Sequence, residues 1–358
     1  MGGVLSVLLI LLYISMLFAY SEESALGVEK ALKLSADVLV PSLFPFMAAG
    51  SFLCLSGALM RENKLYAFLS EKLFSLSKNA FPVFVISLIG GYPVGAGCVD
   101  TLYKKGSISQ YEASECLKFS VNPSPSFVIM SVGAGMLKST KAGALMYSSI
   151  VLSSLTVGIV TRLFRKSTQE KNVTVNGSSP YSFSSAFVGA VKDSTLSIIY
   201  ICAFVVLFFS LSEMLCSVPL NSQLKMFLRC ILEVTNGALL VSEKFSLPHL
   251  TALLSFGGLC TLFQVVNAVS HMGISFLSLL SYRVISAFFG YFYCTLLMKL
   301  FPFAAETVRM GSFQRTAGSS DSITVSFCLI LMCAVFILGD TTLFQKGLTE
   351  AKSESTIA

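Results

Sequence analysis

The sequence predicts an all-α polytopic membrane protein built as an inverted repeat with two broken or re-entrant helical hairpins. Two observations favour a membrane protein: 54% of the 358 residues are hydrophobic and only 12% are charged. Soluble domains average about 45–50% apolar and about 25% charged residues. A third observation favours helices. Apolar runs such as residues 4–20 are continuous, whereas the strands of an outer-membrane barrel alternate apolar and polar residues. These values argue against a cytosolic enzyme and a disordered chain.

The first half of the chain contains six apolar or amphipathic runs. Residues 1–30 are expected to hold an uncleaved transmembrane helix, since Met1-Gly2-Gly3 lacks the positive charge of a secretory signal, which is the alternative. Residues 31–164 are expected to form the first repeat. Its runs are 34–60, broken at Pro41 and Pro45; 61–80, amphipathic and expected on the membrane surface; 81–97, interrupted by Gly90-Gly91-Tyr92-Pro93; 111–137, interrupted by Asn122-Pro123-Ser124-Pro125; and 142–164.

The second half repeats this order after a polar linker at residues 165–186. Residues 187–301 are expected to form the second repeat. Its runs are 196–215; 226–241, interrupted by Glu233, Thr235, Asn236 and Gly237; 250–269, interrupted by Gly257-Gly258; and 274–301. Asp193 and Ser194 are expected to cap the helix that follows them. A polar loop at 302–322 and a transmembrane helix with a tail at 323–358 complete the predicted organisation.

The order of spans and breaks predicts that the two halves are related by inversion. Each half contains a span, a broken hairpin, a broken span and a span. If the hairpin is re-entrant, each half crosses the membrane three times, and an odd number of crossings turns the second half upside down. Interrupted helices in matching places of an inverted repeat are typical of secondary transporters.

Charge gives the orientation and excludes some partners. The chain has 25 basic and 19 acidic residues, and the net charge of +6 is scattered, which favours contact with a lipid bilayer and disfavours nucleic acid. The basic residues of 61–105 and of the linker fall on one predicted side more densely than those opposite, which predicts that this side is cytoplasmic. The 10 cysteines form no CxxC pair, so neither a disulfide framework nor a metal site is expected.

The breaks are the candidate substrate site. Non-helical backbone at membrane depth persists only where protein or a wet cavity covers it, and half-helix N-termini attract anions. The alternative is that Gly and Pro only kink packed helices. The candidate substrate-binding residues are Gly91, Tyr92, Pro93, Gly95, Asn122, Pro123, Ser124, Ser126, Glu233, Thr235, Asn236, Gly257, Gly258 and Gln264.

Three polar side chains carry specific expectations. An ionisable group at membrane depth indicates a functional site, so Glu233 is a candidate; the alternative is an interfacial helix with Glu233 in water. Lys118 faces a cavity or pairs with Glu115 three residues earlier. Gln264 is expected to bond to substrate or to a neighbouring helix. No HExxH, GxSxG or P-loop motif occurs, so we expect neither an enzyme nor a cofactor.

Taken in order, the motifs at the breaks resemble those of the YlbJ (SpoVV) family of sporulation integral membrane proteins. They are GGYPVGA from Gly90, SVNPSPSF from Ser120, LEVTNG from Leu232 and FGGLC from Phe256, with Gln264. The resemblance spans about residues 34–301. It implies nucleoside-recognition gate domains, similar to part of the concentrative nucleoside transporters, with two helical hairpins and a midplane site. This sequence crowds Pro123 and Pro125 together, where Asn-Ala or Asn-Pro is the more usual pattern of that family.

For sporulation members, the resemblance implies movement of dipicolinic acid across the mother-cell-derived outer forespore membrane. We therefore expect a secondary transporter or permease for a small anionic or nucleoside-like solute in a bacterial cell membrane. The alternatives are a structural or scaffolding sporulation membrane protein and a nucleoside-type transporter. A homo-oligomer is compatible with the sequence.

Overall fold

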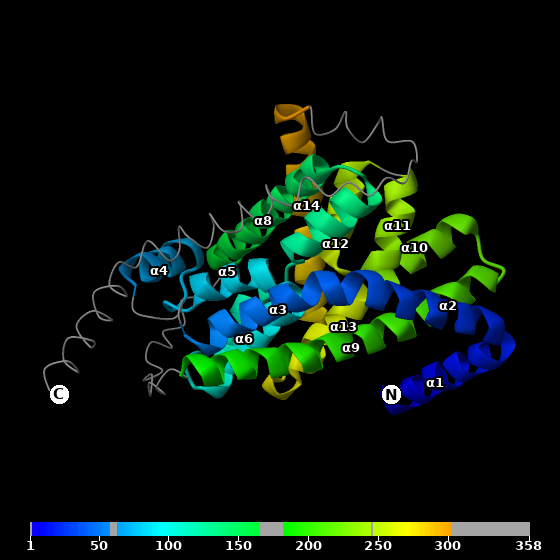
Figure 1. Ribbon diagram of the computed structural model, residues 1–358, viewed down its shortest axis with the longest axis horizontal. Helices are drawn as coiled ribbons and strands as arrows, with labels where there is room; N and C mark the ends of the chain where they lie inside the picture. The colour runs from blue at the N-terminus through cyan, green and yellow to red at the C-terminus, as the bar shows by residue number, and fades with distance from the viewer. Residues whose placement is uncertain (1, 58–62, 165–181, 245, 303–358) are drawn as a thin grey trace, which may run out of the picture. The chain divides into compact units, whose positions relative to one another are not determined.

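The computed structural model describes residues 2–57, 63–164, 182–244 and 246–302, and all regular structure in these ranges is helical (Figure 1). The predicted linker, up to residue 181, and the predicted C-terminal span at 323–338 lie outside the described residues. The elements are α1 (Gly2–Ala19), α2 (Ser21–Leu34), η1 (Ser35–Leu39), α3 (Val40–Leu55), α4 (Lys64–Leu69), η3 (Ser70–Phe74), α5 (Ala80–Gly90), α6 (Tyr92–Lys104), α7 (Gln110–Phe119), η4 (Ser126–Met136), α8 (Thr140–Leu163), α9 (Phe183–Ser217), α10 (Ser222–Leu232), α11 (Val234–Lys244), α12 (Leu247–Phe256), α13 (Gly258–Ala268), η5 (Ser270–Met272) and α14 (Phe276–Leu300).

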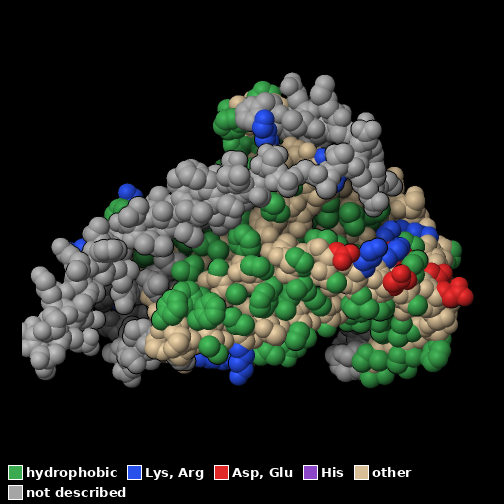
Figure 2. Space-filling view, in the orientation of Figure 1, with side chains coloured by type: hydrophobic (Ala, Val, Ile, Leu, Met, Phe, Trp, Pro, Cys, Tyr) green, Lys and Arg blue, Asp and Glu red, His purple; other side chains and the backbone are tan. Residues whose placement is uncertain are grey.

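Five helical stretches are long and apolar enough to cross a membrane, which makes this chain an all-α integral membrane protein. They are Ser21–Leu55, Thr140–Leu163, Phe183–Ser217, Leu247–Ala268 and Phe276–Leu300. The predicted N-terminal helix forms as α1, an apolar helix of 18 residues. Hydrophobic side chains cover much of the surface over α3 and α9, and charged side chains gather at the end formed by α2 and α10 (Figure 2).

The helices follow the same order in the two predicted halves. Ser21–Leu55 and Phe183–Ser217 are each 35 residues long. The hairpin α5–α6 corresponds to α10–α11, the interrupted span α7–η4 to α12–α13, and α8 to α14. The amphipathic segment α4–η3 precedes the first hairpin and has no counterpart before the second among the described residues.

The two 35-residue helices lie antiparallel. Ser24, near the start of α2, has its hydroxyl oxygen 2.8 Å from that of Ser210, near the end of α9. At the other end, Ser194 near the start of α9 donates to the hydroxyl of Ser51 near the end of α3, at 3.4 Å. Corresponding helices of an inverted repeat run in opposite directions, as this pair does.

The hairpin arms are too short to cross a bilayer. Helices α5 and α10 each have 11 residues, which gives about 16 Å, roughly half of the 30 Å hydrocarbon core. Every α5 residue except Phe81 is buried, whereas no residue of α10 is. The length of the arms therefore favours re-entrant hairpins that turn near the midplane.

Side-chain contacts define the two ends of the bundle. On what we call the linker side, Asp100 of α6 lies 2.9 Å from His271, and Arg162 of α8 donates to the carbonyl of Lys72. On the opposite side, Lys30 of α2 and Arg229 of α10 both pair with Glu213 of α9, at 3.0 and 3.2 Å. The first hairpin therefore opens toward the linker side and the second toward the opposite side.

The predicted break at Pro41 and Pro45 is wrong, because the helix continues through both prolines from Ser21 to Leu55. A π-helical turn at η1 precedes Pro41, which occupies the first turn of α3. Ser42 donates to the carbonyl of Val38 at 2.6 Å, and Ser126 of η4 donates to the carbonyl of Ser42 at 2.7 Å. Hydroxyl donors bond backbone carbonyls beside the two prolines, and a local π-helical turn accommodates Pro41, so the helix is not broken.

Candidate functional site

Four helix interruptions meet inside the bundle. They are Gly91 between α5 and α6, residues 120–124 between α7 and η4, Glu233 between α10 and α11, and Gly257 between α12 and α13. All four were predicted from the sequence. The prediction placed them at corresponding positions of the two halves, and the structure brings them into contact.

Close backbone approaches hold the four interruptions together. A Cβ atom on Gly91 would lie 3.3 Å from Ser124, and one on Gly258 would lie 3.2 Å from the backbone nitrogen of Val234. The hydroxyl of Tyr92 donates to the carbonyl of Leu254, which joins the first hairpin to α12. Gly91 and Gly257 have φ of 90° and 85°, a conformation that only glycine adopts without steric cost. These glycines therefore allow both the turn and the close contact.

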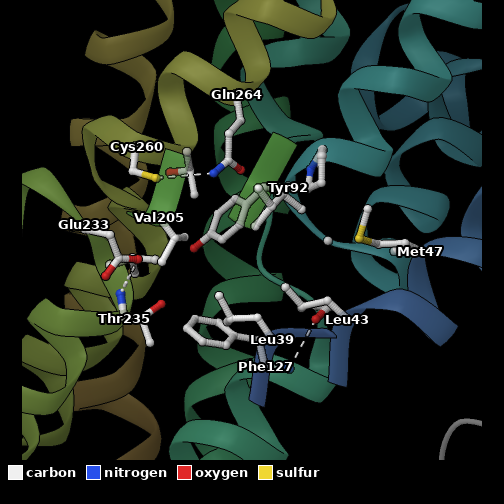
Figure 3. Close-up of a pocket in the computed structure, with 17 residues that line it drawn as sticks. Leu39, Leu43, Met47, Tyr92, Phe127, Val205, Glu233, Thr235, Cys260 and Gln264 are labelled. Atoms are coloured by element: carbon white, nitrogen blue, oxygen red, sulfur yellow. Dashed lines mark hydrogen bonds between the residues drawn. The ribbon is translucent and has the colours of Figure 1, made fainter. Parts of the chain in front are cut away.

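A small cavity lies where the interruptions meet (Figure 3). Its volume of about 40 Å³ holds a few water molecules. Half of the predicted site residues line it: Gly91, Tyr92, Pro93, Ser124, Glu233, Thr235 and Gln264. Leu39, Leu43, Met47 and Phe127 form its apolar wall, and Glu233 lies opposite them (Figure 3).

The other predicted site residues do not line the cavity, and two of them bond the segments around the interruptions to neighbouring groups. Asn122 donates to the hydroxyl of Ser87 at 3.1 Å and to the carbonyl of Phe119 at 2.8 Å. Asn236 donates to Ser212 of α9 at 2.8 Å. The remaining residues of the prediction, which do not line the cavity, are Gly95, Pro123, Ser126, Gly257 and Gly258.

A second, larger cavity reaches this site from the linker side. We call it the vestibule; its volume is about 610 Å³, and it lies between α3, α6, α9 and α13. It shares Pro93, Ile201 and Gln264 with the small cavity. All four of these helices contribute polar side chains to the vestibule. They are Ser51, Asp100, Thr101, Lys104, Lys105, Asp193, Ser197, Tyr200, Gln264 and Asn267. Its volume falls in the range of small-molecule pockets, about 300–1,000 Å³.

Glu233 is buried, with 1% of its surface exposed, so the alternative that it faces bulk water is wrong. Its two carboxylate oxygens accept hydrogen bonds from the backbone nitrogens of Thr235 and Asn236, at 2.9 and 2.6 Å. An acidic side chain that accepts these bonds caps a helix and interacts favourably with the helix dipole. Glu233 therefore places a carboxyl group at the start of α11, beside the cavity.

The four half-helices that begin at the interruptions differ in their N-terminal partners. Glu233 caps α11, and the hydroxyl of Ser124 accepts from the backbone nitrogen of Phe127 in η4 at 3.2 Å. Helices α6 and α13 begin after Gly91 and Gly257, and neither has a side-chain cap. Their first residues, Tyr92, Pro93, Cys260 and Thr261, line the cavity. Two uncapped helix N-termini, which attract negative charge, therefore face it.

Arg283 is the central residue that the sequence prediction missed. It lies in the first third of α14 and is 3% exposed. Its guanidinium donates to the carbonyl of Val121 and, at 3.0 Å, to that of Lys118. The signal was present, because an arginine inside a 25-residue apolar helix marks a functional or structural site.

Lys118 pairs with Glu115, one of the two predicted alternatives. Its ammonium also lies 4.9 Å from the centre of the Tyr282 ring. Gln264 donates to the sulfur of Cys260 at 3.3 Å and stands where the cavity and the vestibule join. Within the described residues, no group of three or more potential metal ligands occurs.

No family model, curated protein or solved structure matches this chain. The fold and the site define its class: an all-α integral membrane protein in which two hairpin turns and two interrupted spans surround a buried cavity.

Proposed function

We propose that this chain is a secondary transporter or permease that moves a small solute, dipicolinic acid during endospore formation, across the outer forespore membrane. The observation that carries the proposal is the meeting of two hairpin turns and two interrupted spans around one buried cavity that adjoins a polar vestibule. Unwound backbone at membrane depth is costly unless protein covers it or it lines a wet cavity. A substrate path explains why this chain has four such interruptions at one place.

The arrangement also supports alternating access. The vestibule opens toward the linker side, while the cavity at the interruptions holds only a few water molecules. In secondary transporters, substrate sites lie near the midplane between two repeats that rock against each other. Passage of a solute here requires the hairpins to separate at Gly91 and Glu233.

The uncapped starts of α6 and α13 favour an anionic solute. Each brings the positive end of a helix dipole to the cavity without a side-chain cap. A planar dicarboxylate such as dipicolinate matches two such sites facing one cavity. This support, together with the motif resemblance to the YlbJ family, leads us to propose dipicolinic acid as the substrate.

One observation favours a second candidate, a nucleoside-type transporter. Glu233 contributes a carboxylate to the cavity, and neither Lys nor Arg is among the described residues that line it. A buried negative charge repels a dianion and suits a neutral solute with hydrogen-bond donors. A scaffolding protein would not need a lined path, and the paired catalytic groups of an enzyme are missing from the sequence.

Uptake into proteoliposomes tests these proposals. We expect vesicles containing the purified chain to accumulate labelled dipicolinate faster than empty vesicles, and excess unlabelled dipicolinate to compete. Uptake of labelled uridine without uptake of dipicolinate would select the nucleoside-type function. Absence of uptake of either solute by folded protein would favour the scaffolding role.

A further inference from the structure

The guanidinium of Arg283 contacts backbone carbonyl oxygens at two of the four interruptions. It donates to Lys118 in the last turn of α7 and to Val121 in the interruption that follows. It also lies 3.5 Å from the carbonyl oxygen of Ser255, in the last turn of α12. α7 and α12 are corresponding half-helices of the two repeats, so Arg283 connects their carboxyl ends.

Carboxyl ends of helices carry unpaired carbonyl groups and partial negative charge. In transporters with interrupted helices, unwound carbonyls and half-helix carboxyl ends coordinate the coupling Na⁺ or H⁺. The carbonyls of Lys118, Val121 and Ser255 form such a set. A guanidinium is permanently charged and offers five N–H donors in a fixed plane, so it provides both the charge and several bonds at once.

We propose that Arg283 permanently occupies the position of a coupling cation, so that this chain works without Na⁺. The other cationic group near these carbonyls, the Lys118 ammonium, is engaged by Glu115 and the Tyr282 ring. Two buried hydroxyls in the same interruptions, those of Ser120 and Ser255, lack a hydrogen-bond partner among the described residues. Removal of the guanidinium would leave the three carbonyls as oxygen ligands suited to Na⁺.

The direct test measures thermal unfolding of the purified full chain, with NaCl or choline chloride at equal ionic strength. We expect the wild-type Tm to be the same in both salts. Arg283→Ala should have a lower Tm in choline chloride, and that Tm should rise with Na⁺ concentration, because an ion that binds only the folded state stabilises it. Arg283→Lys, which keeps the charge, should remain insensitive to Na⁺.

Arg162→Ala is the matched control. Arg162 also donates to a backbone carbonyl, that of Lys72, but lies outside the interruptions. We expect no difference between its Tm values in the two salts. A Na⁺ response in this variant equal to that of Arg283→Ala would overturn the proposal, because the effect would then not belong to the interruptions.

Two further results would overturn the proposal: a Na⁺-specific rise in the wild-type Tm, or a folded Arg283→Ala variant with no response to Na⁺. If Arg283→Ala folds in neither salt, the wild-type comparison decides. The flux experiment rests on the proposed function and is separate: dipicolinate uptake should be equal with Na⁺ or choline outside. Absence of uptake in both salts counts against dipicolinate transport, while the unfolding experiment still decides the role of Arg283.

Discussion

Among the described residues, Glu233 is the one acidic side chain that lines the cavity. We expect Glu233→Gln to abolish or alter solute flux while the protein still folds, because glutamine keeps an acceptor oxygen for the start of α11 but removes the charge. Flux into proteoliposomes and thermal unfolding measure the two effects. Glu112→Gln is the matched control, since Glu112 also accepts a backbone N–H, that of Ser77 at 2.9 Å, outside the site. Unchanged flux in Glu233→Gln would assign Glu233 to helix capping alone.

Asn122 contributes stability at the residue scale. Asn122→Ala removes both donor contacts of a buried amide, to Ser87 and Phe119. We expect a loss of roughly 1–3 kcal/mol in the free energy of unfolding, the cost of one unsatisfied buried partner. Ser148→Ala, which removes an exposed hydroxyl bonded to its own helix, should change stability by less than about 0.5 kcal/mol. Equal losses in the two variants would contradict this role for Asn122.

Sequence reasoning identified the residues that are unusual in their own segment and missed those defined by contact. Glu233 was predicted because a carboxylate interrupts an apolar run. The predicted site residues include no arginine, yet Arg283 reaches Val121, 162 residues away in sequence. The proposed capping by Asp193 and Ser194 is wrong, because α9 begins ten residues before Asp193 and Ser182 caps it. Residue spacing along one helix does not reveal which distant helix packs against it.

The interruption between α7 and η4 tests whether backbone geometry matters for flux. Pro123→Ala combined with Pro125→Ala should let helix α7 continue and place the free N–H groups in its own ladder. We expect loss of dipicolinate flux with the protein still folded. Pro41→Ala is the matched control, since Pro41 lies in a helix that is already continuous. Wild-type flux in the folded double variant would show that the interruption only kinks a packed helix.

Helix α6 offers a matched pair of glycines. A methyl group on Gly95 would overlap the carbonyl oxygen of Ser120 and lie 2.7 Å from the Cβ of Ser87, whereas one on Gly97 would meet nothing within 4 Å. We expect Gly95→Ala to lower the free energy of unfolding by about 1–3 kcal/mol through overpacking. Gly97→Ala should raise it by about 0.5–1 kcal/mol through its better helix propensity. Equal effects in chemical or thermal unfolding would contradict this packing of α6 on the interruption.

At the element scale, the sequence predicted three long helices, both hairpins and both interrupted spans. Clusters of Gly, Pro and polar residues marked all four interruptions correctly. Pro41 and Pro45 were overinterpreted. The backbone beside them is bonded partly by Ser126, a residue of another helix, which donates to the carbonyl of Ser42. Proline alone therefore does not distinguish a functional interruption from a helix whose neighbours re-satisfy its backbone.

For the whole molecule, the inverted arrangement predicts that the two hairpins open to opposite faces of the membrane. Single cysteines at Lys104, the end of α6, and at Gln223, the start of α10, test this in a variant without the ten native cysteines. In right-side-out cells, a membrane-impermeant maleimide should label Gln223→Cys and not Lys104→Cys, because basic residues favour the cytoplasmic face. Both should be labelled after permeabilisation. Labelling of both from one face of intact cells would contradict the inverted arrangement.

The antiparallel pair of 35-residue helices sets a requirement on the lipids around the protein. Each helix is about 52 Å long, and even at a tilt of about 40°, near the upper limit seen in membrane proteins, it projects about 40 Å along the membrane normal. The hydrocarbon core of a typical bilayer is about 30 Å thick. The ends of both helices therefore extend into the headgroup layers, where α2 places Glu22, Glu23, Glu29, Lys30 and Lys33.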